Sequence, residues 1–379
     1  MRKTGTYEIL GSTNYFIPNP LPPTHPSLQL TSETLELYQE ALKNIEKLNE
    51  ASRQIPDQKR FIKSYVIKEA MLSSAIEGIH TTLFDIFTHI QDTSSKQNKN
   101  TQLVVNYVQA LDLAIEMMIN KNLPISSRII CAAHQALLSG DNGNNANPGN
   151  YRKQAVKVGN LTPAPAQKIA DLMSDLEKFI NEDTTLPVLI KAGLAHLQFE
   201  TIHPFLDGNG RIGRLLIILM LIDGKLLHNP VLYVSYYFKK HHFEYYQALD
   251  RVRTHGDFEG WIHYYLQAIN QTALDAYIRT LNIQNLELRL TVLISSDPQF
   301  SRNPSTALAT LKSLFAHPIT TILQISDDID KAYNTTQKIV LNFIKLGIIS
   351  EKVAGEHQKN KRSKHFQFDA YLALLEEEF

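Results

Sequence analysis

The chain has almost no cysteine and no excess charge of either sign. Its 379 residues include a single cysteine, Cys131, which excludes an internal disulfide framework and indicates a reducing compartment. Lysine plus arginine and aspartate plus glutamate both number 38, so no overall attraction to nucleic acid or to anionic membranes is expected. The longest apolar run, 215–222, is too short for a membrane span of about 20 residues, and no apolar segment typical of a signal peptide follows Arg2 and Lys3. We therefore expect a globular cytoplasmic protein.

The length is sufficient for two or three domains, and the residue patterning predicts three regions. Residues 1–100 begin with a proline-rich arm at 1–30, which we expect to be irregular and extended, followed by helices from residue 31 or 32 and over 57–77. Residues 101–275 are expected to be helical except for a short strand pair near 156–162. The helices expected in this second region cover 102–120, 126–138, 166–182, 186–200, 239–255 and 257–271. The predicted fold class is mostly α, a helical bundle with one short β-hairpin.

The third region, 285–379, is predicted to mix helices and strands. Short helices are expected to start within 319–323, at a cap formed by 326–329, and over 335–345. Two strands, 348–353 and 364–368, are expected to follow. This order resembles a winged helix-turn-helix domain of α+β class, with 335–345 in the position of the recognition helix. The basic residues expected on its wing are Lys359, Lys361, Arg362 and Lys364.

DNA binding is one interpretation of this third region. The alternative is a module for oligomerisation or partner docking. The expected recognition helix carries only Lys338 and Lys345 as basic residues, and the whole chain is neutral, so both interpretations stay open.

The most informative segment is 203–214, which reads HPFLDGNGRIGR. Gly208 and Gly210 allow positive φ and let the backbone approach a ligand closely, and Asn209 between them tolerates a left-handed conformation. The apolar run 215–222 predicts a buried helix that begins near Gly208 or Asn209. The first free N–H groups of that helix and its dipole would then favour a phosphate.

Four side chains in the same segment have complementary chemistry. Arg211 and Arg214 are three residues apart, so they lie on one face of the first helical turns, and their guanidinium groups match phosphate oxygens. Asp207 is an oxygen ligand suited to magnesium, which prefers one or two carboxylates together with substrate phosphates. His203 titrates near neutral pH and can accept a proton from a hydroxyl. The segment therefore predicts a site for a magnesium-bound triphosphate beside a general base.

The segment resembles the Fic family signature H-P-F-x-D-G-N-G-R-x-x-R and matches it at every defined position. The resemblance extends over about 60–270. Residues 148–152 and 156–160 are similar to the family's G-x-[YF]-R segment and to the β-hairpin flap that aligns the target peptide. The Pro-Ala-Pro sequence at 163–165 departs slightly from the family's Pro-Pro pair. Residues 244–249 are similar to a helix that borders the adenine pocket.

The resemblance implies a Fic helical bundle and a protein adenylyltransferase. Such an enzyme moves AMP from ATP, with Mg²⁺, onto a Ser, Thr or Tyr hydroxyl of a target protein and releases pyrophosphate. His203 would be the catalytic base, and Asp207 would hold the metal. The residues expected at the ATP site are Gly208, Asn209, Gly210, Arg211, Ile212, Gly213, Arg214 and Tyr245, with Val158, Gly159, Asn160 and Leu161 of the flap.

A second match concerns control of the site. The segment 73–78, SSAIEG, resembles the Fic inhibitory motif [S/T]-x-x-x-E-[G/N], with Ser73 and Glu77 at its defined positions. It precedes the catalytic segment, so the resemblance implies the class with an intramolecular inhibitory helix. If Glu77 pairs with Arg214, that arginine cannot hold the γ-phosphate in its productive place. The alternative is that Glu77 is simply the end of a helix capped by Gly78.

Several further interpretations stay open. The spacing of Gly208, Gly210 and Gly213 also matches the dinucleotide-binding pattern. That pattern requires a preceding strand, whereas the residue pattern of 189–199 predicts a helix. Tyr245 could be a core aromatic. The same site could remove AMP from a modified protein or use another nucleotide or a phosphocholine donor. The chain could also be a DNA-binding regulator, or a dimeric protein that modifies itself.

Overall fold

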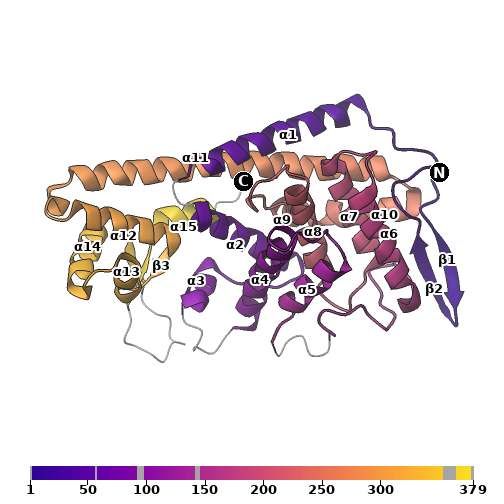
Figure 1. Ribbon diagram of the computed structural model, residues 1–379, viewed down its shortest axis with the longest axis horizontal. Coiled ribbons are helices and arrows are strands. Elements are labelled where there is room, and N and C mark those ends of the chain that lie inside the picture. Colours follow the sequence, from indigo (N-terminus) through magenta and orange to yellow (C-terminus); the bar gives the residue numbers. More distant parts are fainter. Residues whose placement is uncertain (1, 56–57, 92–97, 141–145, 353–363, 377–379) are drawn as a thin grey trace. The chain divides into compact units, whose positions relative to one another are not determined.

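The computed structural model describes residues 2–55, 58–91, 98–140, 146–352 and 364–376 (Figure 1). The chain divides into two compact units. The first unit comprises Met1–Glu50, Tyr65–His80 and Leu103–Ala276, and the second comprises Ala51–Ser64, Thr81–Gln102 and Tyr277–Phe379. The first unit thus contains residues from two of the three regions predicted from the sequence, and the three-part division stays a prediction.

The first unit is mostly helical, as predicted. Four of its helices, α1, α2, α4 and α11, also contribute residues to the second unit. Its elements are β1 (Gly5–Leu10), β2 (Thr13–Pro18), α1 (Ser32–Arg53), α2 (Gln58–Ile76), α4 (Lys99–Ile119), α5 (Ser127–Leu137), a 3-10 turn (Ala166–Lys168), α6 (Ile169–Glu182), α7 (Val188–Ile202), α8 (Asn209–Asp223), α9 (Ser235–Lys240), α10 (His242–His255) and α11 (Phe258–Ser296).

Helices α7 and α8 form the centre of this unit. Both are apolar around most of their circumference, which is typical of helices surrounded by protein on all sides. In α7 the residues from Leu189 to Ile202 are all buried, and in α8 Gly210 and Asp223 are the residues that are not. The two helices pack along each other, and α8 also contacts α5 (Figure 1). The loop 203–208 that joins them is therefore held on a rigid, buried support.

Close packing of α8 on α7 requires Gly213. A Cβ at this position would come within 2.6 Å of Glu200 Oε1 and 3.1 Å of His196 Nδ1. Both side chains are buried on α7, so neither can move into solvent. The last glycine of the predicted phosphate segment thus has a packing role.

The prediction of an irregular arm over 1–30 is wrong for its first half, because β1 and β2 form an antiparallel hairpin from Gly5 to Pro18. The turn uses Gly11, whose φ of +63° suits glycine. Phe16 of β2 is buried, and its backbone N–H donates to the Thr162 carbonyl at 2.9 Å. The prolines misled the prediction, since all of them lie at or after the last residue of β2 and end the strand without preventing it.

The strand pair predicted near 156–162 is reduced to one antiparallel bridge. Val158 and Leu161 exchange two backbone hydrogen bonds, of 2.8 and 2.9 Å, around Gly159 and Asn160. Gly159 has a φ of +57°, which allows so tight a turn. We keep the name flap for these four residues, 158–161.

The second unit contains several short helices and a three-stranded antiparallel sheet of order β3-β5-β4. Its remaining elements are α3 (Leu83–Gln91), a 3-10 turn (Pro298–Phe300), α12 (Pro304–Ala316), β3 (Ile319–Thr320), α13 (Ile322–Ile329), α14 (Tyr333–Lys345), β4 (Ser350–Lys352), β5 (His365–Gln367) and α15 (Asp369–Glu376). Helices α12, α13 and α14 pack on one another, and α3 contacts β3.

Two of the helix starts expected in this unit need correction. Ile319 and Thr320 form a strand, and the helix begins after Thr321, whose side chain accepts a hydrogen bond from the Gln324 N–H at 3.2 Å. Residues 326–329 end this same helix, which stops at Asp330 in a left-handed conformation. Thr321 is a better cap than Ser326, because the Ser326 hydroxyl already donates to the Ile322 carbonyl one turn earlier.

The winged helix-turn-helix domain stays a prediction. The linking segment 356–363, with Lys359, Lys361 and Arg362, lies outside the described residues. Lys364 is described, and its ammonium group forms an ion pair with Glu351 at 2.7 Å.

Among the described helices, α4 is long and apolar enough to cross a membrane by length and composition. This is weak evidence, because a core helix of a globular protein has the same properties. Half of the apolar window of α4 is buried inside the protein.

The hairpin makes a testable contribution to stability through Phe16. We expect Phe16→Ala to lower the free energy of unfolding by about 3 kcal/mol, because it leaves a cavity where β2 meets the segment after the flap. Ile9→Ala is the control, since Ile9 lies in the same hairpin and is 73% exposed. Urea denaturation of both variants measures the difference, and equal stabilities would contradict this account of the hairpin.

Candidate functional site

The loop between α7 and α8 is closed by the side chain of Asn209. Its Oδ1 accepts a hydrogen bond from the Phe205 N–H, and its Nδ2 donates to the Phe205 carbonyl, both at 2.9 Å. The amide of Asn209 is buried and fully used inside the loop. A ligand at this loop would therefore meet Asn209 through its backbone N–H.

Helix α8 begins at this loop with free backbone donors. Gly208 precedes the helix with a φ of +80°, and its carbonyl accepts the N–H of Ile212 at 3.0 Å. The N–H groups of Asn209, Gly210 and Arg211 come before the first intrahelical hydrogen bond, so helical geometry leaves them available. Ile212 has its side chain in the core. The predicted helix start is confirmed, and it exposes donors of the kind that bind anions.

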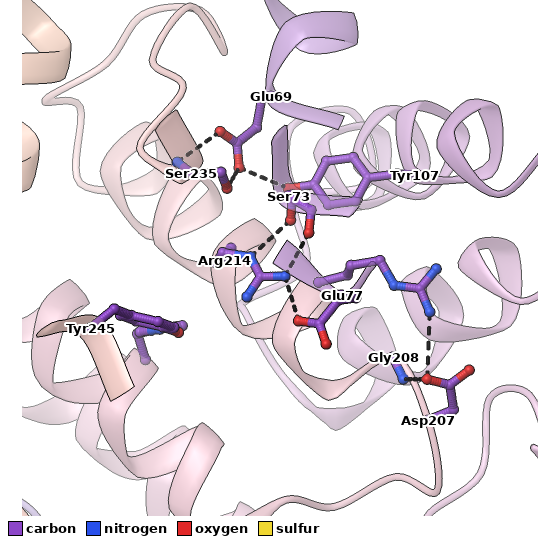
Figure 2. A network of polar contacts seen from close by, with 11 residues as sticks. Glu69, Ser73, Glu77, Tyr107, Asp207, Gly208, Arg214, Ser235 and Tyr245 are labelled. Atoms are coloured by element: carbon purple, nitrogen blue, oxygen red, sulfur yellow. Dashed lines mark hydrogen bonds and ion pairs between the residues drawn. The ribbon is translucent and has the colours of Figure 1, made fainter. Parts of the chain in front are cut away.

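Asp207 stands at the open edge of the loop. Its side chain is 64% exposed, accepts a hydrogen bond from the Gly208 N–H at 2.6 Å, and lies 3.6 Å from Arg211 Nη2 (Figure 2). No cluster of three or more potential metal-binding side chains occurs within the described ranges. A single exposed carboxylate fits Mg²⁺, which would take its other ligands from phosphate oxygens and water.

Arg211 is a buried cation with spare donors. Its Nε and Nη1 atoms are buried and make no hydrogen bond to any described residue. Burial, the largest influence, lowers the pKa of this guanidinium below its ordinary value, and nearby Asp207 and Glu77 raise it in part. An arginine held in this way favours a bound anion, because buried donors without a partner are costly.

Arg214, one turn further along, is already occupied. Its Nε donates to Ser73 Oγ at 2.9 Å, and its Nη2 donates to the Ser73 carbonyl and to Glu77 Oε1, both at 2.8 Å (Figure 2). Burial, the largest single influence, lowers the pKa of Arg214, but Glu77, Tyr245 and Glu200 together outweigh it and raise the pKa. The structure thus brings together the three residues that the sequence placed in the inhibitory contact.

Glu77 follows the last residue of α2 and points at the start of α8. A Cβ built on Gly210 would collide with Glu77 Oε1, so this carboxylate lies directly against the first turn of α8. Burial would raise the pKa of Glu77, but Arg214 lowers it below its usual value, which keeps the group ionised. Gly78 has a φ of +77°, so the helix-ending interpretation of this segment is also correct.

The acidic residue within α2, Glu69, was not found from the sequence. Glu69 is buried and accepts hydrogen bonds from the Ser235 N–H at 3.1 Å, from the Ser235 hydroxyl, and from the Tyr107 hydroxyl at 3.4 Å (Figure 2). Burial raises the pKa of Glu69 to about 7. A signal was present, because Glu69, Ser73 and Glu77 recur every fourth residue and therefore lie on one face of the helix.

His203 ends α7 in a left-handed conformation with a φ of +50°. Its Nδ1 is buried and has no hydrogen-bond partner within the described part of the chain. Burial is the largest influence on the ring and lowers its pKa to about 4. The imidazole is therefore neutral at pH 7, which is the state that a general base requires.

Arg152 connects His203 to the backbone on both sides of the flap. Its guanidinium donates to the carbonyls of His203 at 2.8 Å, Gln154 at 3.0 Å and Ala164 at 2.6 Å, and its own N–H donates to the Pro204 carbonyl at 2.9 Å. The sequence placed Arg152 in a family segment without assigning it a role. Within the flap, Gly159 and Asn160 are exposed, Val158 is half-buried, and Leu161 packs in the core.

Tyr245 lies in the core, so its surroundings favour the alternative that it is a core aromatic. It is 1% exposed, its hydroxyl lies 2.8 Å from His196 Nε2, and its ring stacks on Phe238 at 4.6 Å. Contact of Tyr245 with a nucleotide stays a prediction. Its neighbour Tyr246 is 40% exposed.

Comparison with known proteins agrees with this geometry. Residues 124–221 match the Fic/DOC family, and residues 35–116 match the Fic/DOC family N-terminal domain. The chain is 34% identical over 83 residues to a probable protein adenylyltransferase of Aquifex aeolicus, covering 21% of this chain and 26% of that protein. It is 28% identical over 264 residues to protein adenylyltransferase Fic of Nematostella vectensis, covering 66% and 58%. The chain thus spans between a quarter and three fifths of these two relatives.

Solved structures support the fold. A Fic family protein from Desulfovibrio desulfuricans superposes with a TM-score of 0.57 at 19% identity, over 90% of this chain and 97% of that one. Fic-1 from C. elegans superposes with a TM-score of 0.51 at 18% identity, over 67% and 74%. The mostly helical Fic fold predicted from the sequence is therefore confirmed.

Burial of His203 has a measurable consequence. In the nucleotide-free protein we expect its ring to titrate near pH 4, well below the ordinary histidine value, because the charged form is poorly solvated. NMR of the ring carbons, assigned by the signal lost in His203→Ala, measures this pKa. A His203 ring that titrates near the ordinary histidine value of about 6.5 would contradict the buried environment.

Proposed function

We propose that this chain, a Fic/DOC family protein with the family's N-terminal domain, is a protein adenylyltransferase that moves AMP from ATP to a hydroxyl of a target protein. The names of its relatives support this reaction. The observation that carries the proposal is the meeting of a neutral imidazole, an exposed carboxylate and a buried arginine with spare donors at the start of one helix.

Phosphate binding would use the backbone and Arg211. The free N–H groups of Asn209, Gly210 and Arg211 would donate to the β- and α-phosphate oxygens, and the helix dipole would add attraction. The Nε and Nη1 atoms of Arg211 would gain the acceptors that they lack. Asp207 would hold Mg²⁺, which supplies charge neutralisation on the phosphates when bound.

The chemical step would use His203. Its Nδ1 is buried, so Nε2 is the ring nitrogen that can reach a substrate. Nε2 would take the proton of the target hydroxyl while the oxygen forms a bond to the α-phosphorus. The bond between that phosphorus and the bridging oxygen would break, and pyrophosphate would leave with its electron pair. Positioning and charge stabilisation would provide most of the rate enhancement.

The target segment would lie beside the flap. Gly159 and Asn160 are exposed there, and the flap is braced by Arg152 and by the contact of Phe16 with Thr162. An extended peptide could add to this backbone by strand pairing. The side chain modified would be Ser, Thr or Tyr.

Glu77 would inhibit the reaction. Its carboxylate holds Arg214 and lies against Gly210, where it opposes phosphate by like charge and by occupying space. ATP could still bind, but Arg214 could not hold the γ-phosphate, and the α-phosphate would lie out of line. Removal of AMP, use of another donor and self-modification would use the same site and are alternatives to this reaction. DNA binding by the second unit stays a prediction of the sequence.

Removal of the Glu77 side chain tests the inhibition. We expect Glu77→Gly to raise AMP transfer about 100-fold, because Arg214 becomes free for the γ-phosphate. Incubation with α-phosphate-labelled ATP, Mg²⁺ and cell lysate measures the transfer, either to lysate proteins or to the chain itself. Glu182→Gly is a matched control, because Glu182 is an exposed glutamate at the end of α6. If both variants labelled like the parent protein, Glu77 would not be inhibitory.

Replacement of His203 tests the chemistry. In the Glu77→Gly protein, we expect His203→Ala to lower labelling by at least about 100-fold, since the base is lost. Nucleotide binding, followed by titration calorimetry, should remain, because no phosphate donor is removed. His255→Ala serves as the control. Retained labelling after His203→Ala would show that another group takes the proton.

A further inference from the structure

His134 on α5 is a buried residue that the proposed reaction does not use directly. Both nitrogens of its ring contact backbone atoms. The Gly149 N–H lies 2.9 Å from Nδ1, and the Asp207 carbonyl lies 2.9 Å from Nε2. A backbone N–H can only donate, so Nδ1 accepts and Nε2 carries the hydrogen. The two contacts therefore fix one neutral tautomer, whose Nε2–H donates to the Asp207 carbonyl.

The same ring also supports the loop by stacking. The rings of His134 and Phe205 are nearly parallel, with centroids 3.7 Å apart and an interplanar angle of 7°. A Cβ on Gly208 would lie 3.2 Å from Leu137 and 3.5 Å from His134, both of α5. The loop between α7 and α8 thus rests on one turn of α5, and the ring of His134 touches it at two places.

The peptide between Asp207 and Gly208 is the one that needs such a support. Its carbonyl accepts from His134, and its N–H donates to Asp207 Oδ1 at 2.6 Å. Glycine tolerates positive and negative φ about equally, so this peptide could rotate at little steric cost. Rotation would turn the carbonyl away from α5 and release the Asp207 carboxylate from the N–H. A carbonyl oxygen turned toward the first N–H groups of α8 would repel phosphate.

We propose that His134 is a positioning residue for AMP transfer, which holds the peptide between Asp207 and Gly208 so that its carbonyl faces away from the phosphates. The proposal rests on the proposed function. His134 reaches no substrate atom and acts through Asp207, and its second contact fixes the turn at Gly149, three residues before Arg152. It therefore aligns the carboxylate proposed to bind Mg²⁺ with the backbone that leads to the flap.

Two substitutions of His134 test its contacts with Asp207 and Gly149 separately. His134→Gln places an amide N–H where Nε2 was and can keep the donor to Asp207. His134→Asn places an oxygen where Nδ1 was and can keep only the acceptor for Gly149. Both remove the aromatic stack on Phe205, and Asn, which is one methylene shorter than Gln, leaves the larger void, so the thermal stability of each variant is measured beside its activity. In the Glu77→Gly protein we expect His134→Gln to keep kcat/KM for MgATP within about tenfold, and His134→Asn to lower it on the order of 100-fold with an increased requirement for Mg²⁺.

Hydrogen–deuterium exchange of the nucleotide-free variants provides a readout that does not depend on activity. Peptides covering 205–211 should exchange faster in His134→Asn than in His134→Gln. Equal exchange and equal kinetics in the two variants, with a similar loss of thermal stability, would show a purely structural role and overturn the proposal. If the Glu77→Gly parent transfers no AMP, the proposed function fails, and the exchange comparison still decides the role of His134.

The unaltered protein gives an independent measurement if either variant does not fold. Nitrogen-15 NMR of the histidine rings reports which nitrogen carries the hydrogen. We expect a His134 ring protonated at Nε2 and unprotonated at Nδ1 at neutral pH. A ring protonated at Nδ1 would contradict the contact with Asp207 and overturn the proposal.

Discussion

Two buried guanidinium groups lie beside the start of α8, and the arrangement of the site follows from their need for negative charge. Arg214 has this charge from Glu77, whereas Arg211 has Asp207 at 3.6 Å, a smaller influence from Glu77, and two donors without a partner in the described structure. Leaving a buried charge without its partner costs about 3–5 kcal/mol. In the proposed reaction a triphosphate would satisfy both arginines, so Glu77 and ATP would compete for the same positive charge.

Such competition would allow the proposed inhibition to come from a helix outside the proposed catalytic loop. Glu77 is not the only residue of this segment that Arg214 holds, because the arginine also bonds Ser73 one turn earlier on α2. Two turns earlier, Glu69 fixes the helix independently of Arg214. Glu69 bonds the Ser235 backbone and the Tyr107 hydroxyl, both within the first unit. The position of the Glu77 carboxylate is therefore set by a row of contacts along one face of α2. His203, the proposed base, needs no comparable control, since burial already keeps it neutral.

The sequence predicted the start of α8 better than its surroundings, for physical reasons. The glycines, the arginines and the long apolar run define a helix start locally, so α8 and its loop could be inferred from adjacent residues. The ring of His134 and the amide of Asn209 act through backbone atoms of distant or neighbouring segments, and the sequence does not show which side chains have a backbone partner.

The β1–β2 hairpin was missed because the prolines after it dominated the pattern. The burial of Tyr245 depends on packing against α7 and α9, which helical periodicity cannot resolve.

A loop that binds anions has to turn its carbonyl groups away from them, and this loop does so with partners from several elements. Most carbonyls between α7 and α8 accept a hydrogen bond from a donor on the protein side. The pairs are His203 with Arg152 Nε, Pro204 with the Arg152 N–H, Phe205 with Asn209 Nδ2, Asp207 with His134 Nε2, and Gly208 with the Ile212 N–H. With these oxygens engaged, the N–H groups at the start of α8 dominate the field over the loop. In the proposed function Arg152 and His134 would therefore contribute to anion recognition as Arg211 does, although neither would reach the ligand, because they determine the sign of the charge that the backbone presents.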